Sequence, residues 1–195
     1  MVRASGLVDM GDMKMTTASK VTMARIALIP FFVASALIDF SGHNYVALAI
    51  FIVAALTDSL DGYIARHYNQ ISDFGKFIDP IADKLLVTAA LLIFVERGQM
   101  SSWACIIVIA REFAVSGLRL VAVEKGTVIA AAMSGKIKTA ASIVCSCVMF
   151  LPFHNNALLP FLTVDRLCVA IIVITTVYSG VEYFIDNKNA LGIED

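Results

Sequence analysis

The chain has 195 residues, of which 59% are hydrophobic and 16% are charged, and its formal net charge is −1. Soluble domains are about 45–50% apolar and about 25% charged, so this composition excludes an ordinary soluble globule and an intrinsically disordered chain. The near-neutral charge also argues against a general nucleic-acid-binding protein. A polytopic membrane protein with one domain is the class that remains.

Apolar stretches recur along the whole chain. A helix needs about 20 mostly apolar residues to cross the hydrocarbon core, and six stretches come close to that length. They are continuous and do not alternate with polar residues, so they predict an all-α fold and not a β-barrel. Polar ends in two stretches and the shortness of the fifth leave a count of five spans with one interfacial helix open. The six predicted transmembrane helices are Thr22–Phe40, Tyr45–Ala65, Phe74–Phe94, Trp103–Val123, Lys136–Leu151 and Leu167–Phe184.

Basic residues are distributed unequally between the predicted loops. With the N-terminus in the cytoplasm, most lysines and arginines outside the spans are cytoplasmic, and only Arg97 and Arg166 lie on the outer side. Cytoplasmic loops are enriched in Lys and Arg, so the sequence predicts an N-in and C-in topology. Residues 1–20 are expected to form a leader, either disordered or a short interfacial helix. Residues 21–186 form the membrane domain, and residues 187–195 form a cytoplasmic tail.

Four aspartates stand where the second predicted span ends and the third begins. Asp58 and Asp61 are three residues apart, and Asp79 and Asp83 are four apart, so each pair shares a helix face. A short connection makes the two helices antiparallel neighbours, which lets all four acids converge at the cytoplasmic end. Charges inside spans cost at least ~2.5 kcal/mol each on insertion scales, so their presence indicates a function.

The chemistry of this cluster favours a metal-bound diphosphate. Oxygen-only ligands suit hard cations such as Mg²⁺ or Mn²⁺, and no His or Cys lies in the cluster to favour zinc. Two such ions would clamp a diphosphate. Gly62 lets a ligand approach the backbone, and Arg66 can reach phosphate oxygens from the same face. The alternative is a structural set of ion pairs with Arg66, Lys76 and Lys84, but three bases do not neutralise four acids.

A second charged cluster lies in the fourth and fifth predicted spans. Glu112, Ser116 and Arg119 share one face of the fourth span, and Arg111 lies on the adjacent face. An arginine inside a span is costly and usually functional. The alternative for Arg111 is a structural ion pair with Glu112.

Two lysines open the fifth predicted span. Lys136 and Lys138 diverge by about 200° on a regular helix, so both serve one site only if the helix start is frayed or one lysine snorkels. Positive-inside anchoring is the alternative role for both. A dianionic phosphate monoester would suit the four bases of this cluster, which are Arg111, Arg119, Lys136 and Lys138.

The string Asp58-x2-Asp61-Gly62-x2-Ala65-Arg66-x8-Gly75-x3-Asp79-x3-Asp83 resembles the CDP-alcohol phosphotransferase signature at every fixed position. Members of that family are six-helix membrane enzymes, often homodimers, in which an alcohol displaces CMP from a CDP-linked substrate with the help of two divalent metals. The resemblance implies a metal site of Asp58, Asp61, Asp79 and Asp83, with Asp83 also the general base. It implies contacts to the CDP-linked substrate from Asp58, Asp61, Gly62, Arg66 and Gly75.

The strings AREFAVSGLR, residues 110–119, and GKIKTA, residues 135–140, resemble the bacterial branch of the family that joins CDP-diacylglycerol to glycerol 3-phosphate. This implies a glycerol 3-phosphate site of Arg111, Arg119, Lys136 and Lys138. It also implies Mg²⁺ as the usual cation, a homodimer, and a place in the bacterial cytoplasmic membrane with the active site facing the cytoplasm.

The reaction expected from this resemblance is a direct displacement, because no Cys, Ser or His is placed to act as a covalent nucleophile. Three alternatives remain. The first is a family enzyme with another acceptor, such as inositol phosphate, serine or phosphatidylglycerol. The second is a membrane prenyltransferase, and the third is a cation transporter that uses intramembrane acids.

Overall fold

The computed structural model describes residues 17–67, 73–124, 132–152, 157–159 and 162–188. Within these ranges, side chains are described except at residues 17–20, 58–67, 73–80, 83, 124 and 157–159.

Six helices account for nearly all of the described residues, as the apolar runs predict, and each predicted span falls largely inside one of them. Between the last two helices, β1 (Ala157–Leu159) and β2 (Leu162–Thr163) form a short antiparallel hairpin. This hairpin is an addition to the predicted all-α fold. The helices are α1 (Thr17–Leu37), α2 (His43–His67), α3 (Asp73–Glu96), α4 (Ser102–Glu124), α5 (Met133–Met149) and α6 (Val164–Asp186).

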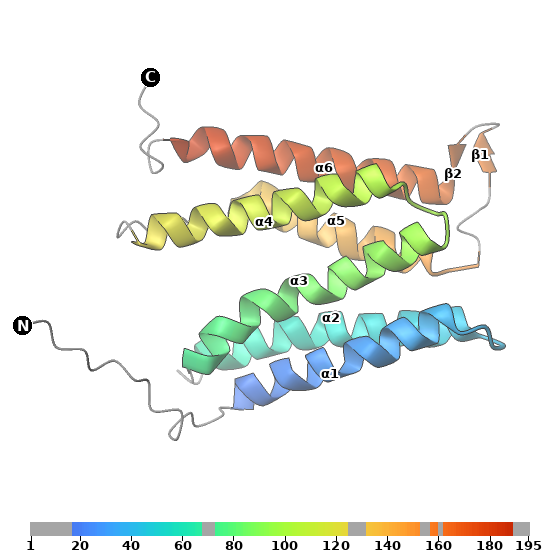
Figure 1. The fold of residues 1–195 in the computed structure, drawn as a ribbon, viewed down its shortest axis with the longest axis horizontal. Helices are drawn as coiled ribbons and strands as arrows, with labels where there is room; N and C mark the ends of the chain where they lie inside the picture. The colour runs from blue at the N-terminus through green and yellow to red at the C-terminus, as the bar shows by residue number, and fades with distance from the viewer. Residues whose placement is uncertain (1–16, 68–72, 125–131, 153–156, 160–161, 189–195) are drawn as a thin grey trace, which may run out of the picture.

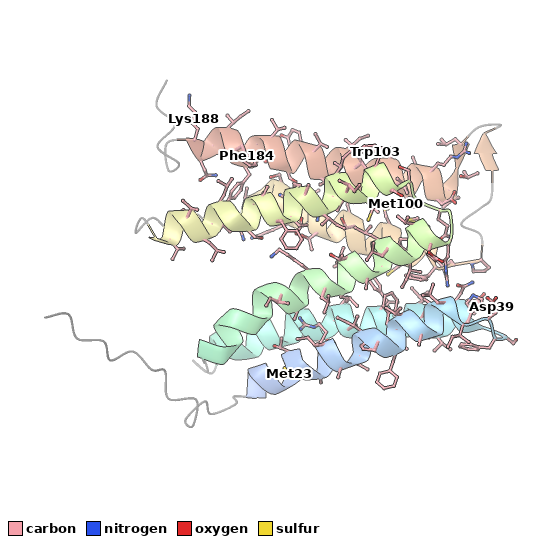
Figure 2. The ribbon with its side chains drawn as sticks, in the orientation of Figure 1. Met23, Asp39, Met100, Trp103, Phe184 and Lys188 are labelled. Carbon is pink, nitrogen blue, oxygen red and sulfur yellow. The ribbon has the colours of Figure 1, made fainter. Side chains whose placement is uncertain are left out.

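The helices run up and down along a common direction. The starts of α1, α3 and α5 and the ends of α2, α4 and α6 all lie at one end of the bundle (Figure 1). We call this the site end, because the helix segments that carry the four predicted aspartates lie there. Figure 2 shows Met23 and Lys188 at the site end and Asp39 and Trp103 at the opposite end. The alternation places the predicted aspartate helices, α2 and α3, with their aspartate-bearing segments at the site end.

Helix α3 connects two groups of helices. It packs against α1 and α2 on one side and against α4 and α5 on the other, while α6 packs against α4 and α5. Four fully buried phenylalanines join α1, α2, α3 and the end of α5, with ring centroids 4.8–6.0 Å apart in the closest pairs. Such aromatic contacts add stability beyond the area they bury. These residues are Phe32, Phe51, Phe94 and Phe150.

The outer surface is strongly apolar. Large side chains such as Trp103, Phe113, Leu120 and Ile174 are each more than 60% exposed. Water-soluble monomers rarely expose so much contiguous apolar surface. The outer faces of α4 and α6 are therefore suited to contact hydrocarbon or another apolar partner.

One helix within the described residues, Val164–Asp186, is long and apolar enough by itself to cross a membrane. Two shorter apolar helical stretches, Val21–Leu37 and His43–Thr57, fall below that length. In α4, Arg111, Glu112 and Arg119 interrupt the apolar run. Six membrane crossings and the N-in, C-in orientation therefore stay predictions.

Candidate active site

A cavity of about 550 Å³ opens among the helices, and all six helices contribute to its wall. Its inner part is apolar and includes Phe51 of the aromatic cluster, Leu91 and Val108. Its remaining wall carries most of the charged side chains that the structure describes at the site end. Those charged lining residues are Arg25, Lys84, Arg111, Glu112, Arg119, Lys136 and Lys138.

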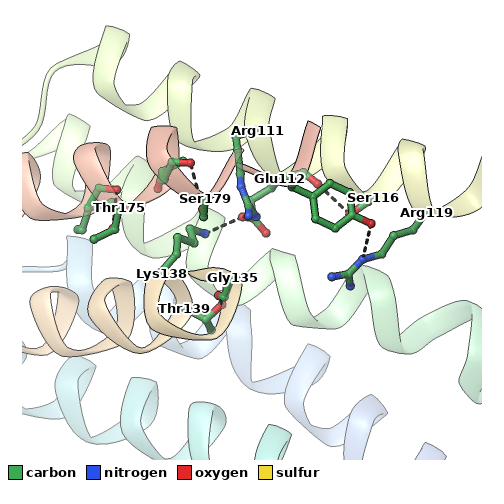
Figure 3. A network of polar contacts seen from close by, with 12 residues as sticks. Arg111, Glu112, Ser116, Arg119, Gly135, Lys138, Thr139, Thr175 and Ser179 are labelled. Atoms are coloured by element: carbon green, nitrogen blue, oxygen red, sulfur yellow. Dashed lines mark hydrogen bonds and ion pairs between the residues drawn. The ribbon is translucent and has the colours of Figure 1, made fainter. Parts of the chain in front are cut away.

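Glu112 of α4 holds two of the bases together (Figure 3). Arg111 Nη1 donates to Glu112 Oε1 over 3.0 Å, and Lys138 Nζ of α5 donates to the same oxygen over 2.6 Å. Lys138 is only 3% exposed, so this carboxylate compensates for the burial of its ammonium group. The predicted ion pair of Arg111 with Glu112 is therefore present, and it extends to a second helix.

One hydrogen-bond donor of the Arg111 guanidinium is unused among the described residues. Its Nε is buried and has no hydrogen-bond partner among the described residues. A buried donor without a partner carries a desolvation penalty of about 1–3 kcal/mol. An anionic ligand in the cavity would remove that penalty, so the unpaired Nε is consistent with a phosphate site at Arg111.

Arg119 lies two turns further along α4 and is held by α6. Its Nε donates to the Tyr183 hydroxyl over 3.2 Å, and its guanidinium carbon lies 5.5 Å from the centroid of the same ring. Tyr183 is 2% exposed and lines the cavity. Ser116, which shares this face of α4, donates to the Glu112 carbonyl over 2.8 Å within its own helix. The arrangement leaves Arg119 fixed at one nitrogen with its other donors available.

The two lysines of α5 both line the cavity, although their environments differ. Lys138 is buried against Glu112, whereas Lys136 is exposed in the first turn of the helix. Helix α5 begins at Met133, so both lysines lie in helical backbone. The angle of about 200° between the two lysines therefore does not keep them from one cavity. Lys138 lines it as a buried residue, and Lys136 lines it as an exposed one.

Sequence reasoning missed contributions from α1, α5 and α6. Arg25 is 2% exposed and lines the cavity, although the sequence assigned it to neither predicted site. Ser142 lines the same cavity, and its buried hydroxyl has no partner among the described residues. Ser179 and Tyr183 lie in an apolar run of α6 that carries no motif. The charge of Arg25 was a usable signal, whereas the other three offered none.

The predicted metal and diphosphate residues lie on α2 and α3 at the site end, but their side chains lie outside the described residues. Ala82 and Lys84, which precede and follow Asp83 in the sequence, line the cavity. The cavity therefore reaches the segment of α3 that carries the last two aspartates. Among the side chains that are described, no group of three or more His, Cys, Asp or Glu residues could hold a metal ion. The predicted metal and diphosphate residues whose side chains are not described are Asp58, Asp61, Gly62, Arg66, Gly75, Asp79 and Asp83.

The charged side chains around the cavity indicate which kind of ligand it suits. Among its described lining residues, the acid Glu112 is engaged by Arg111 and Lys138, and two further bases, Arg119 and Lys136, line the same cavity. A small ligand carrying negative charge would suit these four bases around one acid. The Arg111 Nε could donate a hydrogen bond to a phosphate-bearing molecule, and the Ser142 hydroxyl could donate or accept one.

Comparison with known proteins gives one consistent family. Residues 15–181 match the model of the CDP-alcohol phosphatidyltransferase family. A Bacillus subtilis (strain 168) protein named CDP-diacylglycerol–glycerol-3-phosphate 3-phosphatidyltransferase is 46% identical over 189 residues, covering 89% of this chain and 95% of the relative. Proteins of the same name from Haemophilus influenzae and Rickettsia felis are 35% and 33% identical. They cover 92% and 84% of this chain and 97% and 90% of their own lengths.

Proposed function

The chain belongs to the CDP-alcohol phosphatidyltransferase family, and we propose that it transfers the phosphatidyl group of CDP-diacylglycerol to glycerol 3-phosphate, releasing CMP. The observation that carries the choice of acceptor is the basic cavity, whose wall holds Arg111, Arg119, Lys136 and Lys138 around one engaged acid, Glu112. Inositol and serine lack a phosphate monoester, which is the dianionic group that these bases would bind. The relatives' names agree with this choice of substrates.

In this proposal the acceptor phosphate is bound by Arg111, Arg119, Lys136 and Lys138. Three observations support it: all four bases line one cavity, Arg111 Nε is unpaired, and Glu112 holds Arg111 and Lys138 side by side. The acceptor's glycerol end would then extend toward the α3 segment that includes Ala82 and Lys84.

Two divalent cations, Mg²⁺ in the first instance, are proposed for the segment of aspartates. The donor set fits them, because Asp58, Asp61, Asp79 and Asp83 offer only oxygen ligands, and because α2 and α3 bring these segments to the same end of the bundle (Figure 1). When bound, the cations would neutralise the diphosphate and stabilise charge on its oxygens. Arg66 and the backbone at Gly62 would hold the same diphosphate, with Gly75 allowing close packing.

The chemical step proposed for these residues is a single displacement. Asp83 accepts the proton of the acceptor's 1-hydroxyl, whose oxygen forms a bond to the phosphorus that carries diacylglycerol. The bond from that phosphorus to the CMP oxygen breaks, and CMP leaves. Positioning and charge stabilisation supply most of the acceleration in phosphoryl transfer, so the fixed bases of the acceptor site contribute by orienting the hydroxyl.

The proposal places the enzyme in the bacterial cytoplasmic membrane with six crossings, both termini inside, and the cavity open to the cytoplasm. The up-and-down arrangement and the apolar outer faces of α4 and α6 support this topology. The acyl chains of CDP-diacylglycerol would remain in the surrounding lipid. A homodimer belongs to the same proposal and rests on resemblance to the family.

The test is CMP release by detergent-purified protein supplied with CDP-diacylglycerol and Mg²⁺ across an acceptor panel. The panel contains glycerol 3-phosphate, inositol phosphate, inositol, serine and phosphatidylglycerol, each with and without EDTA. We expect release with glycerol 3-phosphate and loss of release with EDTA. Release with a different acceptor would overturn the acceptor assignment, and EDTA-resistant release would overturn the metal assignment. Absence of cytidine-nucleotide binding would favour a transporter.

A further inference from the structure

Arg111 lies between two glycines that come from different helices. A Cβ atom added at Gly180 of α6 would stand 3.1 Å from Arg111 Cγ and 3.9 Å from its Nε. A Cβ atom added at Gly135 of α5 would stand 3.9 Å from Arg111 Nη2. The first distance is tighter than an ordinary van der Waals contact, whereas the second is ordinary. Gly180 is therefore the position at which a side chain would displace Arg111.

The arginine has little freedom to avoid such a clash. Cγ is near the root of the side chain, so its position is set by the α4 backbone, and the far end of the side chain is tied to Glu112 at 3.0 Å. Gly180 itself is buried in α6, which packs against α4. A methyl group at Gly180 would require a rotamer change or a shift of α4 from α6, and either change would move the guanidinium.

The position of this guanidinium matters because one of its donors is unused. Nε, the atom 3.9 Å from the added Cβ, is buried and has no hydrogen-bond partner among the described residues. A donor that is already desolvated and fixed binds an anion with little reorganisation. The same methyl group would be in ordinary contact with Nε, so it would disturb this nitrogen through the displacement of Cγ.

We propose that Gly180 is a positioning residue for acceptor binding: its missing side chain lets Arg111 lie against α6 and present its guanidinium to the acceptor phosphate. The inference rests on the proposed function for the identity of the acceptor. It deepens that function by assigning part of the acceptor specificity to α6, a helix in which the sequence predicted no acceptor-site residue.

The test compares Gly180→Ala with Gly117→Ala. Gly117 is a helical glycine of α4 whose added Cβ would meet nothing within 4 Å, so it controls for the change in helix propensity. Gly180→Ala is expected to raise the KM for glycerol 3-phosphate about 10-fold, equivalent to one lost interaction of ordinary strength. The KM for CDP-diacylglycerol should change less than about 2-fold, and Gly117→Ala should leave both constants unchanged. Equal behaviour of the two variants would overturn the proposal.

A double-mutant cycle tests whether Gly180 acts through Arg111. In an Arg111→Ala background, where the Cγ contact is gone, Gly180→Ala should cause no further rise in the KM for glycerol 3-phosphate. The same cycle is measured by melting temperature in detergent: Gly180→Ala should lower it in the wild type but not in Arg111→Ala. Additive effects in either readout would contradict the proposal.

The melting-temperature cycle needs no substrate. It therefore tests the positioning role of Gly180 separately from the proposed function. If the wild type did not use glycerol 3-phosphate, the proposed function would fail, while coupled melting temperatures would still support the contact between Gly180 and Arg111. If the wild type used glycerol 3-phosphate and the cycle were additive, the role of Gly180 alone would fail.

Discussion

Glu112 accepts hydrogen bonds from Arg111 and Lys138 through a single oxygen atom, Oε1. We expect Glu112→Gln to destabilise the protein by about 1–3 kcal/mol, because the buried Lys138 ammonium loses its counter-charge. It should also raise the KM for glycerol 3-phosphate, since both cations lose their anchor. Thermal unfolding in detergent and steady-state kinetics measure the two effects.

The matched control for this prediction removes both charges. Glu112→Gln combined with Lys138→Met removes the Glu112 and Lys138 charges and leaves Arg111 charged, so it should recover the part of the lost stability that is due to the buried ammonium group. It should not recover acceptor use, because Lys138 is part of the proposed phosphate site. Full recovery of both properties would show that the pair is only a structural contact.

Tyr183 offers a narrower test of the acceptor site. Tyr183→Phe keeps the ring beneath the Arg119 guanidinium but removes the hydroxyl that accepts from Arg119 Nε. We expect the KM for glycerol 3-phosphate to rise about 5-fold, which corresponds to one hydrogen bond of about 1 kcal/mol. Tyr183→Leu, which also removes the ring, should raise it further. A Tyr183→Phe variant with wild-type kinetics would show that the hydroxyl does not orient Arg119.

Some residues of this site could be predicted from the sequence and others could not, and the difference depends on the residue type. Arg111, Arg119, Lys136 and Lys138 are rare charges in apolar runs, so their place in one cavity was predictable from the cost of burying them. Gly180 and Tyr183 are ordinary residues of an apolar helix, and only the packing of α6 against α4 gives them a role. Tertiary contacts of this kind leave no periodic signal in a single sequence.

At the scale of elements, the helices were predictable within a few residues because each apolar run is bounded by polar residues, Gly or Pro. The predicted span Phe74–Phe94 lies within α3, and Trp103–Val123 lies within α4. The hairpin of β1 and β2 was not predictable, because strands of two and three residues are too short to show alternation.

Arg97 joins three elements at the end of the bundle opposite the cavity mouth. It donates from Nη2 to the Ala36 carbonyl in the last turn of α1, and its guanidinium carbon lies 5.5 Å from the centroid of Phe150, just after α5. Burial lowers the pKa of Arg97, and the nearby Asp39 carboxylate raises it. A cation at a helix C-terminus also interacts favourably with the helix dipole. Arg97 thus ties α1, α3 and α5 together where they end.

We therefore expect Arg97→Ala to reduce stability by about 2 kcal/mol through loss of a charge-assisted hydrogen bond and a cation–π contact. Arg97→Lys should recover only part of this, because an ammonium group lacks the planar fork of guanidinium. Neither variant should change the KM for CDP-diacylglycerol or glycerol 3-phosphate, since Arg97 does not line the cavity. Thermal unfolding and kinetics on the same preparations measure both outcomes, and a selective rise in one KM would contradict this structural role.

At the scale of the whole molecule, the charges that make the site also weaken the membrane signal. Helix α4 carries Arg111, Glu112 and Arg119 within its apolar run, whereas α6 alone among the described helices is long and apolar enough by itself to cross a membrane. The bundle shields the cavity-facing charges, while its outer faces expose residues such as Phe113 and Leu120. The number of crossings and their orientation therefore call for a direct measurement.

The proposed orientation predicts which ends of the bundle are accessible from each side of the membrane. Lys188 follows α6 at the site end, and Ser102 begins α4 at the opposite end (Figures 1 and 2). Lys188→Cys should react with a membrane-impermeant maleimide only in inverted vesicles, and Ser102→Cys should react in intact cells. Three of the four native cysteines are buried, so the unsubstituted protein sets a low background. Because three helices separate the two positions, labelling from the same side would show that at least one helix does not cross. Exchange of the two patterns would place the cavity mouth on the outer face, away from any cytoplasmic supply of glycerol 3-phosphate.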